Sequence, residues 1–452
     1  MENRLSLTDS YKISHSVQYP PGTTNVYSYF ESRGGQFAET VFFGLQYILK
    51  EYLSDPLQPW EVEDAQTLYD AHLGPGIFNR KGFDHILKDH VGKWPLRIKA
   101  VPEGTVVPTG NVLMTVENTC PQCYWLTNFF ETLLVQTWYP STVCGVSREM
   151  KRVILDALNK TGDPALVNFK LHDFGCRGVS SMESARIGGM AHLVNFMGTD
   201  TVPGLVGARR YYNESMAGFS IPAAEHSTIT AWGRSGEREA FENMLVQYPT
   251  GLVAVVSDSY NIFDACSVLW GTVLRDKVLG RDGTLVVRPD SGVPHIVVPQ
   301  ILDILGEKFG FTTNSKFYKV LDPHIRVIQG DGIDYEETKR ILGAMMEKGW
   351  SADNVAFGMG GGLLQKLDRD TQKYAFKCSS IIRDGKEVDV YKQPVGASWK
   401  ASKKGRLGLI KWSNGSYVTM SDSKFNLLQT VYENGVLLKD QSFVDVRKRA
   451  AL

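Results

Sequence analysis

The feature that most constrains the fold is a regular alternation through the middle of the chain, from about residue 165 to about residue 375. Short apolar runs alternate there with helical segments, and nearly every run ends in a polar turn or at glycine. We expect strands at 167–171, 193–196, 219–221, 252–256, 285–287, 325–328 and 355–357. We expect helices at 182–192, 227–247, 262–279, 296–309 and 334–348. Repeated strand–helix units of this kind predict a parallel α/β barrel.

The segments on either side of this region follow a mixed pattern. Helices are predicted at 40–53, 61–73, 128–138 and 147–159, and short strands within 96–119. Asn414-Gly415 and Asn434-Gly435 indicate hairpin turns near the C-terminus. We therefore predict an α/β barrel as the catalytic domain over residues 161–374. Residues 1–160 and 375–452 are expected to form one mixed α+β domain for capping and dimerisation.

The composition argues against several classes of protein. Lysine and arginine together number 49, as do aspartate and glutamate, so the formal net charge is zero. A general nucleic-acid binder needs a basic excess to neutralise phosphates. No run approaches the roughly 18 apolar residues of a membrane span, and the first residues lack the apolar stretch of a signal peptide. We expect a cytoplasmic protein that binds neither nucleic acid nor membranes.

The six cysteines contain one close pair, Cys120 and Cys123, in the sequence Cys-Pro-Gln-Cys. A zinc site needs a second pair of ligands, and no second Cys-x-x-Cys pair exists in the chain. We therefore interpret the cysteines as reduced thiols, with a redox role for the close pair as the alternative.

Polar and glycine residues follow the predicted strands, at the ends where barrel enzymes carry their active sites. The stretch GMGGG at 358–362 predicts a phosphate cradle, because glycine lets a ligand approach the backbone; a tight turn is the alternative. In RPDSG at 288–292, the arginine can donate two hydrogen bonds to a phosphate or carbonyl group, and the aspartate offers a carboxylate to ribose hydroxyls or Mg²⁺. QGDG at 329–332 again combines glycine with an aspartate. His226 is expected on the same face, although a lone histidine is more often structural. No nucleophile elbow of a hydrolase is present.

Several stretches resemble the nicotinamide phosphoribosyltransferase family. They lie at 8–12, 27–33, 170–178, 198–201, 222–228, 288–292, 330–332 and 358–369, and the resemblance runs from Asp9 to about Arg447. It implies a type II phosphoribosyltransferase fold, an irregular α/β barrel with a second domain, in a head-to-tail homodimer. The implied reaction transfers the phosphoribosyl group of phosphoribosyl pyrophosphate to nicotinamide in NAD salvage. The products are nicotinamide mononucleotide and pyrophosphate.

The resemblance also implies roles for individual residues. Nicotinamide would bind to Phe174, Asp200 and Arg288, with the partner subunit's Tyr11 on the other face of the ring. The phosphoribosyl and pyrophosphate groups would bind to Arg177, Gly330, Asp331, Gly360 and Gly361, with the partner subunit's Arg33, Arg369 and Lys377. The catalytic residues would be His226, Asp258 and Asp290. The two aspartates would place Mg²⁺ through water, and ATP would phosphorylate His226.

Two departures from the family pattern stand out. Met359 replaces a serine that is common in the family, and the segment between Arg33 and Thr40 is short where some relatives carry a charged insertion. Two other functions remain open from the sequence. One is a nicotinate or quinolinate phosphoribosyltransferase of the same fold. The other is a binding or signalling protein that has lost the chemistry.

Overall fold

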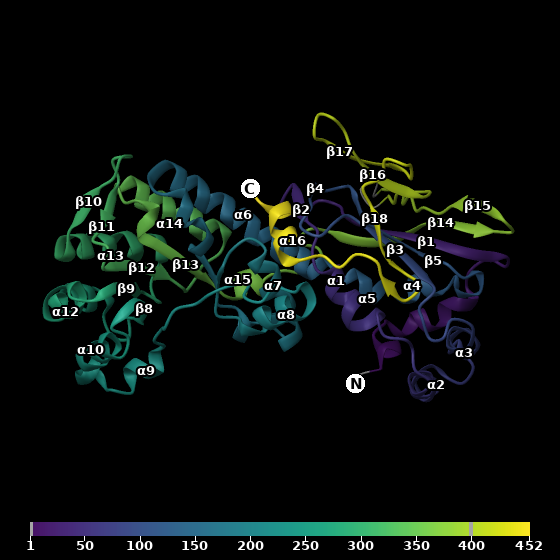
Figure 1. Ribbon diagram of the computed structural model, residues 1–452, viewed down its shortest axis with the longest axis horizontal. Helices are drawn as coiled ribbons and strands as arrows, with labels where there is room; N and C mark the ends of the chain where they lie inside the picture. The colour runs from purple at the N-terminus through teal and green to yellow at the C-terminus, as the bar shows by residue number, and fades with distance from the viewer. Residues whose placement is uncertain (1–2, 397–400) are drawn as a thin grey trace. The chain divides into compact units, whose positions relative to one another are not determined.

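The computed structural model describes residues 3–396 and 401–452, and the chain divides into two units (Figure 1). The first unit comprises Met1–Gly145, Tyr211–Asn213 and Asp368–Ala451, so it is built from both terminal segments. The second comprises Val146–Arg210 and Glu214–Leu367. The divisions fall before residue 146 and before residue 368, whereas the sequence placed them at 160/161 and 374/375.

The second unit is organised around a parallel sheet in the order β7-β6-β13-β12-β9-β8. Its strands are β6 (Leu171–Asp173), β7 (Gly198–Thr199), β8 (Thr250–Val256), β9 (Asp282–Arg288), β12 (Ile325–Gln329) and β13 (Val355–Met359). Every neighbouring pair is parallel, including Val327 beside Val355 and Leu285 beside Ile325. All six strands therefore end at one edge of the sheet.

The segment from residue 219 to 224 connects the two edge strands of this sheet. Phe219 forms a parallel bridge with Gly198 of β7, and Ala223 forms one with Ala254 of β8. The backbone N–H of Thr199 donates to the Phe219 carbonyl at 3.0 Å, and that of Ala224 donates to the Ala254 carbonyl at 2.9 Å. The sheet therefore curls into an irregular barrel, which confirms the predicted fold class.

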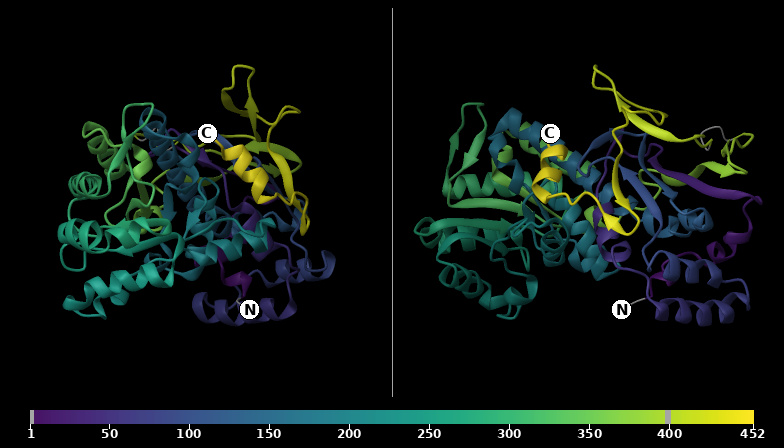
Figure 2. Two further views of the ribbon diagram at one scale, coloured as in Figure 1. Left: turned by 60° about the vertical axis from the view of Figure 1, so that its left-hand side comes forward. Right: turned by 45° about the vertical axis from the view of Figure 1, so that its right-hand side comes forward.

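Helices cover the outside of the barrel sheet (Figures 1 and 2). The longer ones are α6 (Trp138–Thr161, which begins in the first unit), α7 (Met182–Leu193), α8 (Val202–Tyr212), α10 (Glu237–Gln247), α13 (Pro294–Phe309) and α14 (Tyr335–Glu347). Shorter helical elements are η5 (Pro164–Phe169), η6 (Cys176–Gly178), α9 (His226–Thr230), η7 (Arg234–Gly236), α11 (Ile262–Asp264), η8 (Ala265–Val273), α12 (Arg275–Leu279), η9 (Ala352–Asn354) and α15 (Gly361–Leu364). Strands β10 (Phe311–Thr313) and β11 (Lys319–Leu321) form a separate antiparallel pair.

Five predicted elements of the barrel differ from the structure. Residues 219–221 form no regular strand and make only an isolated bridge at Phe219. Residues 164–169 form a 3₁₀ helix that begins at Pro164, so the first strand starts only at Leu171. The predicted strand at 193–196 is the end of α7 and the turn after it. The predicted helix at 227–247 is interrupted near Gly233, whose φ of 73° is incompatible with a right-handed helix. The helix expected at 262–279 contains a π-helical stretch, η8.

The first unit contains a seven-stranded antiparallel sheet in the order β15-β14-β1-β5-β3-β18-β19. Its strands are β1 (Thr23–Ser32), β3 (Leu96–Ala100), β5 (Val112–Asn118), β14 (Tyr374–Arg383), β15 (Lys386–Asp389), β18 (Gln429–Glu433) and β19 (Val436–Leu437). Two-stranded pairs join β2 (Glu39–Val41) to β4 (Val106–Pro108), and β16 (Leu407–Lys411) to β17 (Tyr417–Ser421). Both predicted hairpins are confirmed, and Asn434 and Gly435 have the positive φ values that such a turn requires.

Helices of the first unit are mostly short. They are η1 (Arg4–Ser6), η2 (Ser10–Val17), α1 (Leu45–Ile48), η3 (Leu49–Leu53), α2 (Pro59–Leu73), α3 (Arg80–Asp89), η4 (Pro121–Cys123), α4 (Leu126–Phe129), α5 (Glu131–Val135) and α16 (Phe443–Ala450). The helix predicted at 40–53 begins only after strand β2, and the one at 128–138 is broken between α4 and α5. No helix of the described residues is long and apolar enough to cross a membrane.

Candidate active site

The carboxyl ends of the barrel strands carry the polar residues that the sequence singled out. Phe174 follows β6, Asp200 follows β7 and Asp258 follows β8, while Arg288 is the last residue of β9. Gly330 and Asp331 follow β12, and Gly360 and Gly361 follow β13. Because the six strands are parallel, these residues occupy one end of the barrel, as the active residues of barrel enzymes do.

Phe174 packs against two glycines, and this sets the place of its ring. A Cβ atom on Gly358 would lie 2.0 Å from Cε2 of Phe174, so only a residue without a side chain fits beneath the ring. A Cβ on Gly330 would lie 3.3 Å from the same ring atom and 3.2 Å from Nε of Arg288. The Arg288 guanidinium carbon is 5.7 Å from the ring centroid. An aromatic face, a cation and bare backbone therefore lie together, as a planar heteroaromatic ligand requires.

Arg288 is held in place by Asp290. The Nε and Nη2 atoms donate to Oδ1 at 3.1 and 2.9 Å, and Nη2 also donates to Oδ2 at 2.9 Å. Both side chains are largely buried, at 22% and 16% exposure, so the pair is shielded from solvent. Within residues 3–396 and 401–452, Nη1 of Arg288 has no hydrogen-bond partner and is available to an acceptor on a ligand.

Asp200 is an exposed carboxylate at the end of β7, next to the β6 strand that leads to Phe174. Its backbone N–H donates to the Asp173 carbonyl at 2.9 Å, and its side chain accepts a hydrogen bond from the Ser220 hydroxyl. Asp173 is buried, and burial raises the pKa of its carboxyl to about 6, although the Gly175 N–H donates to Oδ1 at 2.7 Å. Asp173 could not be anticipated from the sequence, because nothing local in the sequence shows how deeply this residue is buried.

His226 and Asp258 form a pair on neighbouring elements. Nε2 of His226 donates to Oδ1 of Asp258 at 2.9 Å; the imidazole is 47% exposed and the carboxylate only 4%. The buried aspartate fixes the orientation of the ring and places the proton on Nε2, which leaves a lone pair on Nδ1. This arrangement of a base held by a carboxylate suits an imidazole that acts as a nucleophile.

The glycine stretch after β13 lies beside the turn that carries Arg177. A Cβ on Gly178 would be 3.8 Å from the Gly361 nitrogen, whereas a Cβ on Gly361 would meet no atom within 4 Å. The backbone at Gly361 is therefore open, with a cationic side chain on the adjacent turn. Met359 is buried at 1% exposure and packs towards Gly362, so its side chain lies in the interior.

The four remaining predicted residues, Tyr11, Arg33, Arg369 and Lys377, belong to the first unit. Tyr11 is 59% exposed on η2. Burial lowers the pKa of Lys377, and the nearby cations Arg33, Lys392 and Arg369 lower it further against the opposing effect of Glu131. Arg33 pairs with buried Glu31 at 2.8 Å, yet its Nη2 atom is buried with no partner among the described residues. This cluster of cations, in which only Lys392 was not anticipated, is suited to a polyanion.

A cavity of about 790 Å³ opens at the other end of the barrel strands. Ile221, Val286, Ile328 and Ala356 line it, and these residues also belong to the apolar cluster that packs against Phe174. Lys170 lies at its wall, where Nζ donates to the carbonyls of Asp353 and Val355 at 2.8 and 2.9 Å. Burial lowers the pKa of Lys170 to about 7. No local pattern in the sequence points to Lys170, which stands directly before β6.

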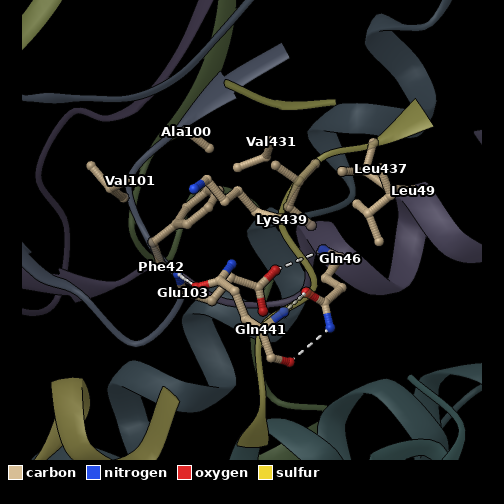
Figure 3. Close-up of a pocket in the computed structure, with 11 residues that line it drawn as sticks. Phe42, Gln46, Leu49, Ala100, Val101, Glu103, Val431, Leu437, Lys439 and Gln441 are labelled. Carbon is tan, nitrogen blue, oxygen red and sulfur yellow. Dashed lines mark hydrogen bonds between the residues drawn. The ribbon is translucent and has the colours of Figure 1, made fainter. Parts of the chain in front are cut away.

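A second cavity, in the first unit, is of structural character (Figure 3). Its volume is about 10 Å³, and the side chains of Gln46, Glu103 and Gln441 in its wall accept hydrogen bonds from one another's backbone. The Gln46 backbone N–H donates to Glu103 at 2.7 Å, the Gln441 backbone N–H donates to the Gln46 side chain at 2.7 Å, and the Glu103 backbone N–H donates to the Gln441 side chain at 3.0 Å. We assign no ligand to it.

Comparison with known proteins identifies the family of the chain. The nicotinate phosphoribosyltransferase (NAPRTase) family matches residues 169–436, and the N-terminal domain of nicotinamide phosphoribosyltransferase matches residues 3–98. A nicotinamide phosphoribosyltransferase of Xanthomonas campestris pv. campestris (strain 8004) is 50% identical over 463 residues, which cover 100% of this chain and 98% of the relative. The chain belongs to the nicotinamide phosphoribosyltransferase family.

Two solved structures share the fold of this family member at low identity. A nicotinate-nucleotide pyrophosphorylase from Pyrococcus furiosus aligns over 99% of this chain and 95% of its own, with a TM-score of 0.61 and 15% identity. The human nicotinic acid phosphoribosyltransferase aligns over 98% and 92%, with a TM-score of 0.58 and 15% identity. The barrel with a second domain is thus the type II phosphoribosyltransferase fold.

Proposed function

We propose that the protein transfers the phosphoribosyl group of phosphoribosyl pyrophosphate to nicotinamide, giving nicotinamide mononucleotide and pyrophosphate. The observation that carries this proposal is the arrangement of Phe174, Asp200 and Arg288 at the strand ends of the barrel, in a chain of this family. Phe174 offers a face for the pyridine ring. Arg288 has a donor for the carboxamide oxygen, and Asp200 has an acceptor for the carboxamide N–H₂.

The reaction depends more on positioning the two substrates than on acid–base catalysis. The lone pair of the pyridine nitrogen attacks the anomeric carbon of the ribose as the carbon–oxygen bond to pyrophosphate breaks, through an oxocarbenium-like state. No proton has to be removed, so the residues act by holding the ring and stabilising charge. The open backbone at Gly361 and the side chain of Arg177 would receive the 5′-phosphate. Asp290 and Asp331 would hold the ribose hydroxyls.

Asp258 and Asp290 fit a role in holding Mg²⁺ through water. They follow β8 and β9, whose ends are joined by a 3.0 Å hydrogen bond from Ser257 to Arg288. Both oxygens of Asp290 already accept from Arg288, and one of Asp258 accepts from His226, so their remaining lone pairs suit bound water. Magnesium supplies neutralising charge for the departing pyrophosphate when it is bound.

His226 fits a role as the residue that ATP phosphorylates. Its Nδ1 lone pair would attack the terminal phosphorus of ATP, forming a nitrogen–phosphorus bond and releasing ADP, while Nε2 stays bonded to Asp258. The added negative charge would lie beside the proposed magnesium position and favour binding of the phosphoribosyl donor. Water would then cleave the nitrogen–phosphorus bond after the transfer, releasing phosphate and free His226, so that ATP hydrolysis is coupled to turnover.

A homodimer with shared active sites completes the proposal. The active site in the barrel of one subunit would be completed by residues of the other subunit. These residues would be the exposed Tyr11 and the cation cluster of Arg33, Arg369 and Lys377. The unpartnered guanidinium nitrogen of Arg33 supports a role in binding an anion. Tyr11 would then stack on the nicotinamide face opposite Phe174.

Nicotinate is the second candidate acceptor, because the family that matches residues 169–436 is described by that substrate. Asp200 argues for nicotinamide: the nicotinate carboxylate offers no donor and would repel Asp200. One charged hydrogen bond is worth roughly 1.5–3 kcal/mol, so with the added repulsion we expect nicotinamide to be preferred on the order of a hundredfold. Arg288 acts in the opposite direction by attracting nicotinate.

The test compares kcat/KM for nicotinamide and nicotinate in the parent protein, in Asp200→Asn and in the matched control Ser220→Ala. Asp200→Asn should lower kcat/KM for nicotinamide and reduce the preference for nicotinamide over nicotinate. The neutral amide of asparagine can donate a hydrogen bond to the carboxylate of nicotinate. Ser220→Ala removes the hydroxyl that donates to Asp200 but keeps the charge, so its preference should stay near that of the parent. Equal preferences in parent and Asp200→Asn contradict the role of Asp200, and a parent that favours nicotinate overturns the acceptor.

A further inference from the structure

Four side chains of the first unit that the proposed reaction does not use converge on one point. His85, His90, Cys120 and Cys123, here called the Cys₂His₂ cluster, each present one nitrogen or sulfur atom, and these four atoms all lie within 4.8 Å of one another. The cysteine pair alone did not predict zinc, because the sequence contains no second Cys-x-x-Cys pair. The structure supplies that second pair as histidines.

The backbone holds the two halves of the cluster on separate elements. His85 is on α3, and His90 is the residue that caps the helix, with its N–H donating to the Ile86 carbonyl at 3.2 Å. Cys120 precedes the short turn η4 and Cys123 is its last residue, and the Cys123 N–H donates to the Cys120 carbonyl at 2.9 Å. Asn118 anchors this turn by donating to the same carbonyl at 2.8 Å. The thiols and the imidazoles are therefore brought together by tertiary packing.

His85 is oriented as a metal ligand is. Its Nδ1 lies 2.6 Å from Oδ2 of Asp89, which fixes the proton on Nδ1 and leaves the lone pair on Nε2. That Nε2 atom lies 3.3 Å from the sulfur of Cys120. A carboxylate that accepts from one nitrogen of a histidine while the other binds a metal is a common arrangement around zinc.

His90 provides an independent sign. Its ring meets that of His85 edge to face, with centroids 5.2 Å apart. Its Nε2 atom is buried and has no hydrogen-bond partner among residues 3–396 and 401–452. A buried ring nitrogen without a partner is unfavourable, and coordination through Nε2 would provide the partner.

We propose that the Cys₂His₂ cluster binds one structural Zn²⁺ ion. Two sulfurs and two nitrogens are the donor set that zinc takes in closed tetrahedral sites, with Cys-x₂-Cys and His-x₄-His spacings in the usual range. Zinc bond lengths place tetrahedral sulfur and nitrogen ligands about 3.6 Å apart, close to the 3.3 Å between Nε2 of His85 and Sγ of Cys120. Both thiols lose a proton to solvent on binding, so two thiolates balance the metal charge without any redox change.

Four protein ligands would fill the coordination sphere of the zinc ion and leave no position for a substrate. The site would therefore stabilise the fold and take no part in catalysis. It would fasten the end of α3 to the turn that follows β5. Phe83 of α3 already packs against Trp125, which lies just after this turn, with ring centroids 4.8 Å apart. Both cysteines are free thiols in the structure. The alternative to zinc binding is a disulfide between Cys120 and Cys123, which would remove both thiolate ligands.

The first experiment measures zinc in the full-length protein, purified from zinc-supplemented cells under reducing conditions, by inductively coupled plasma mass spectrometry. We expect one zinc per chain, and less than about a tenth of that in Cys120→Ser and in His90→Gln, because each loses one of four ligands. The matched controls are Cys378→Ser, a partly buried thiol of the same unit, and His72→Gln, an exposed histidine of α2. Both should keep one zinc per chain.

The second experiment needs no change to a ligand and so does not depend on variant folding. Chelated wild-type protein is titrated with Co²⁺, which should give the thiolate charge-transfer band and the visible bands of a tetrahedral S₂N₂ site, and lose both when Zn²⁺ is added. Asp89→Asn should weaken metal affinity about 10- to 100-fold, because Asp89 positions His85. Wild-type protein with substoichiometric zinc and no tetrahedral cobalt spectrum overturns the proposal, as does a Cys120–Cys123 disulfide found by mass spectrometry in that preparation.

Discussion

Gly358 allows a direct test of how Phe174 is placed for the acceptor. Replacing Gly358 with alanine puts a Cβ atom 2.0 Å from Cε2, 2.1 Å from Cδ2 and 2.8 Å from Cζ of the Phe174 ring. Carbon atoms in contact lie about 3.5–4.0 Å apart. The ring must therefore move by about 1.5–2 Å, the difference between these distances, and it has to leave the position in which it would stack on the acceptor.

The expected loss follows from that displacement. Stacking of two rings contributes about 0.5–1.5 kcal/mol, or about 2- to 13-fold in affinity. Misplacement of a reacting group by about 1 Å costs on the order of 100-fold. We expect kcat/KM for nicotinamide to fall by about 10- to 100-fold, with a stability loss of about 1–3 kcal/mol from overpacking. The KM for phosphoribosyl pyrophosphate should change little.

The assay is steady-state formation of nicotinamide mononucleotide with each substrate varied in turn, alongside thermal unfolding. Gly343→Ala is the matched control, because it lies within helix α14 and its Cβ would meet no atom within 4 Å; it should keep full activity and gain about 0.5–1 kcal/mol. A folded Gly358→Ala protein with an unchanged nicotinamide KM and kcat would show that Phe174 does not position the acceptor. Equal losses for both substrates would point to a general disturbance instead.

Three further changes test the electrostatics and the proposed assembly. Because the pKa of Asp173 is raised from 3.8 to about 6, the free energy of unfolding falls as pH rises between those values. Asp173→Asn removes this ionisation and should stabilise the protein above pH 6 by about 3 kcal/mol. Thermal unfolding measured as a function of pH checks this, and an unchanged pH profile contradicts it. His226→Gln should retain a weak basal reaction but lose the stimulation by ATP, measured as turnover with and without ATP; stimulation equal to that of the parent excludes the phosphohistidine. Mixing inactive Tyr11→Ala chains with inactive Asp290→Ala chains should restore activity in heterodimers, and heterodimers that form without activity would refute shared sites.

Much of the barrel could be predicted because its signals are local. An apolar run followed by aspartate, arginine or glycine indicates both a strand and the end where it stops, and this placed Arg288, Asp290 and Gly330 on one face. The errors arose where backbone constraints override periodicity. Pro164 starts a 3₁₀ helix that runs into a predicted strand, and Gly233 divides a predicted helix. The roles of Phe174 and Tyr11 came from family resemblance, since an aromatic residue alone is uninformative.

The sequence by itself determined the fold class, the family and the residue types at the strand ends, because these depend on neighbours along the chain. Only the tertiary structure decided what depends on distance through space. It showed the burial that shifts the pKa values of Asp173 and Lys170, and the fit of Phe174 against Gly358. It also joined His85 and His90 to Cys120 and Cys123. Helix α3 and the turn after β5 meet through packing, which the spacing of residues along the chain does not encode.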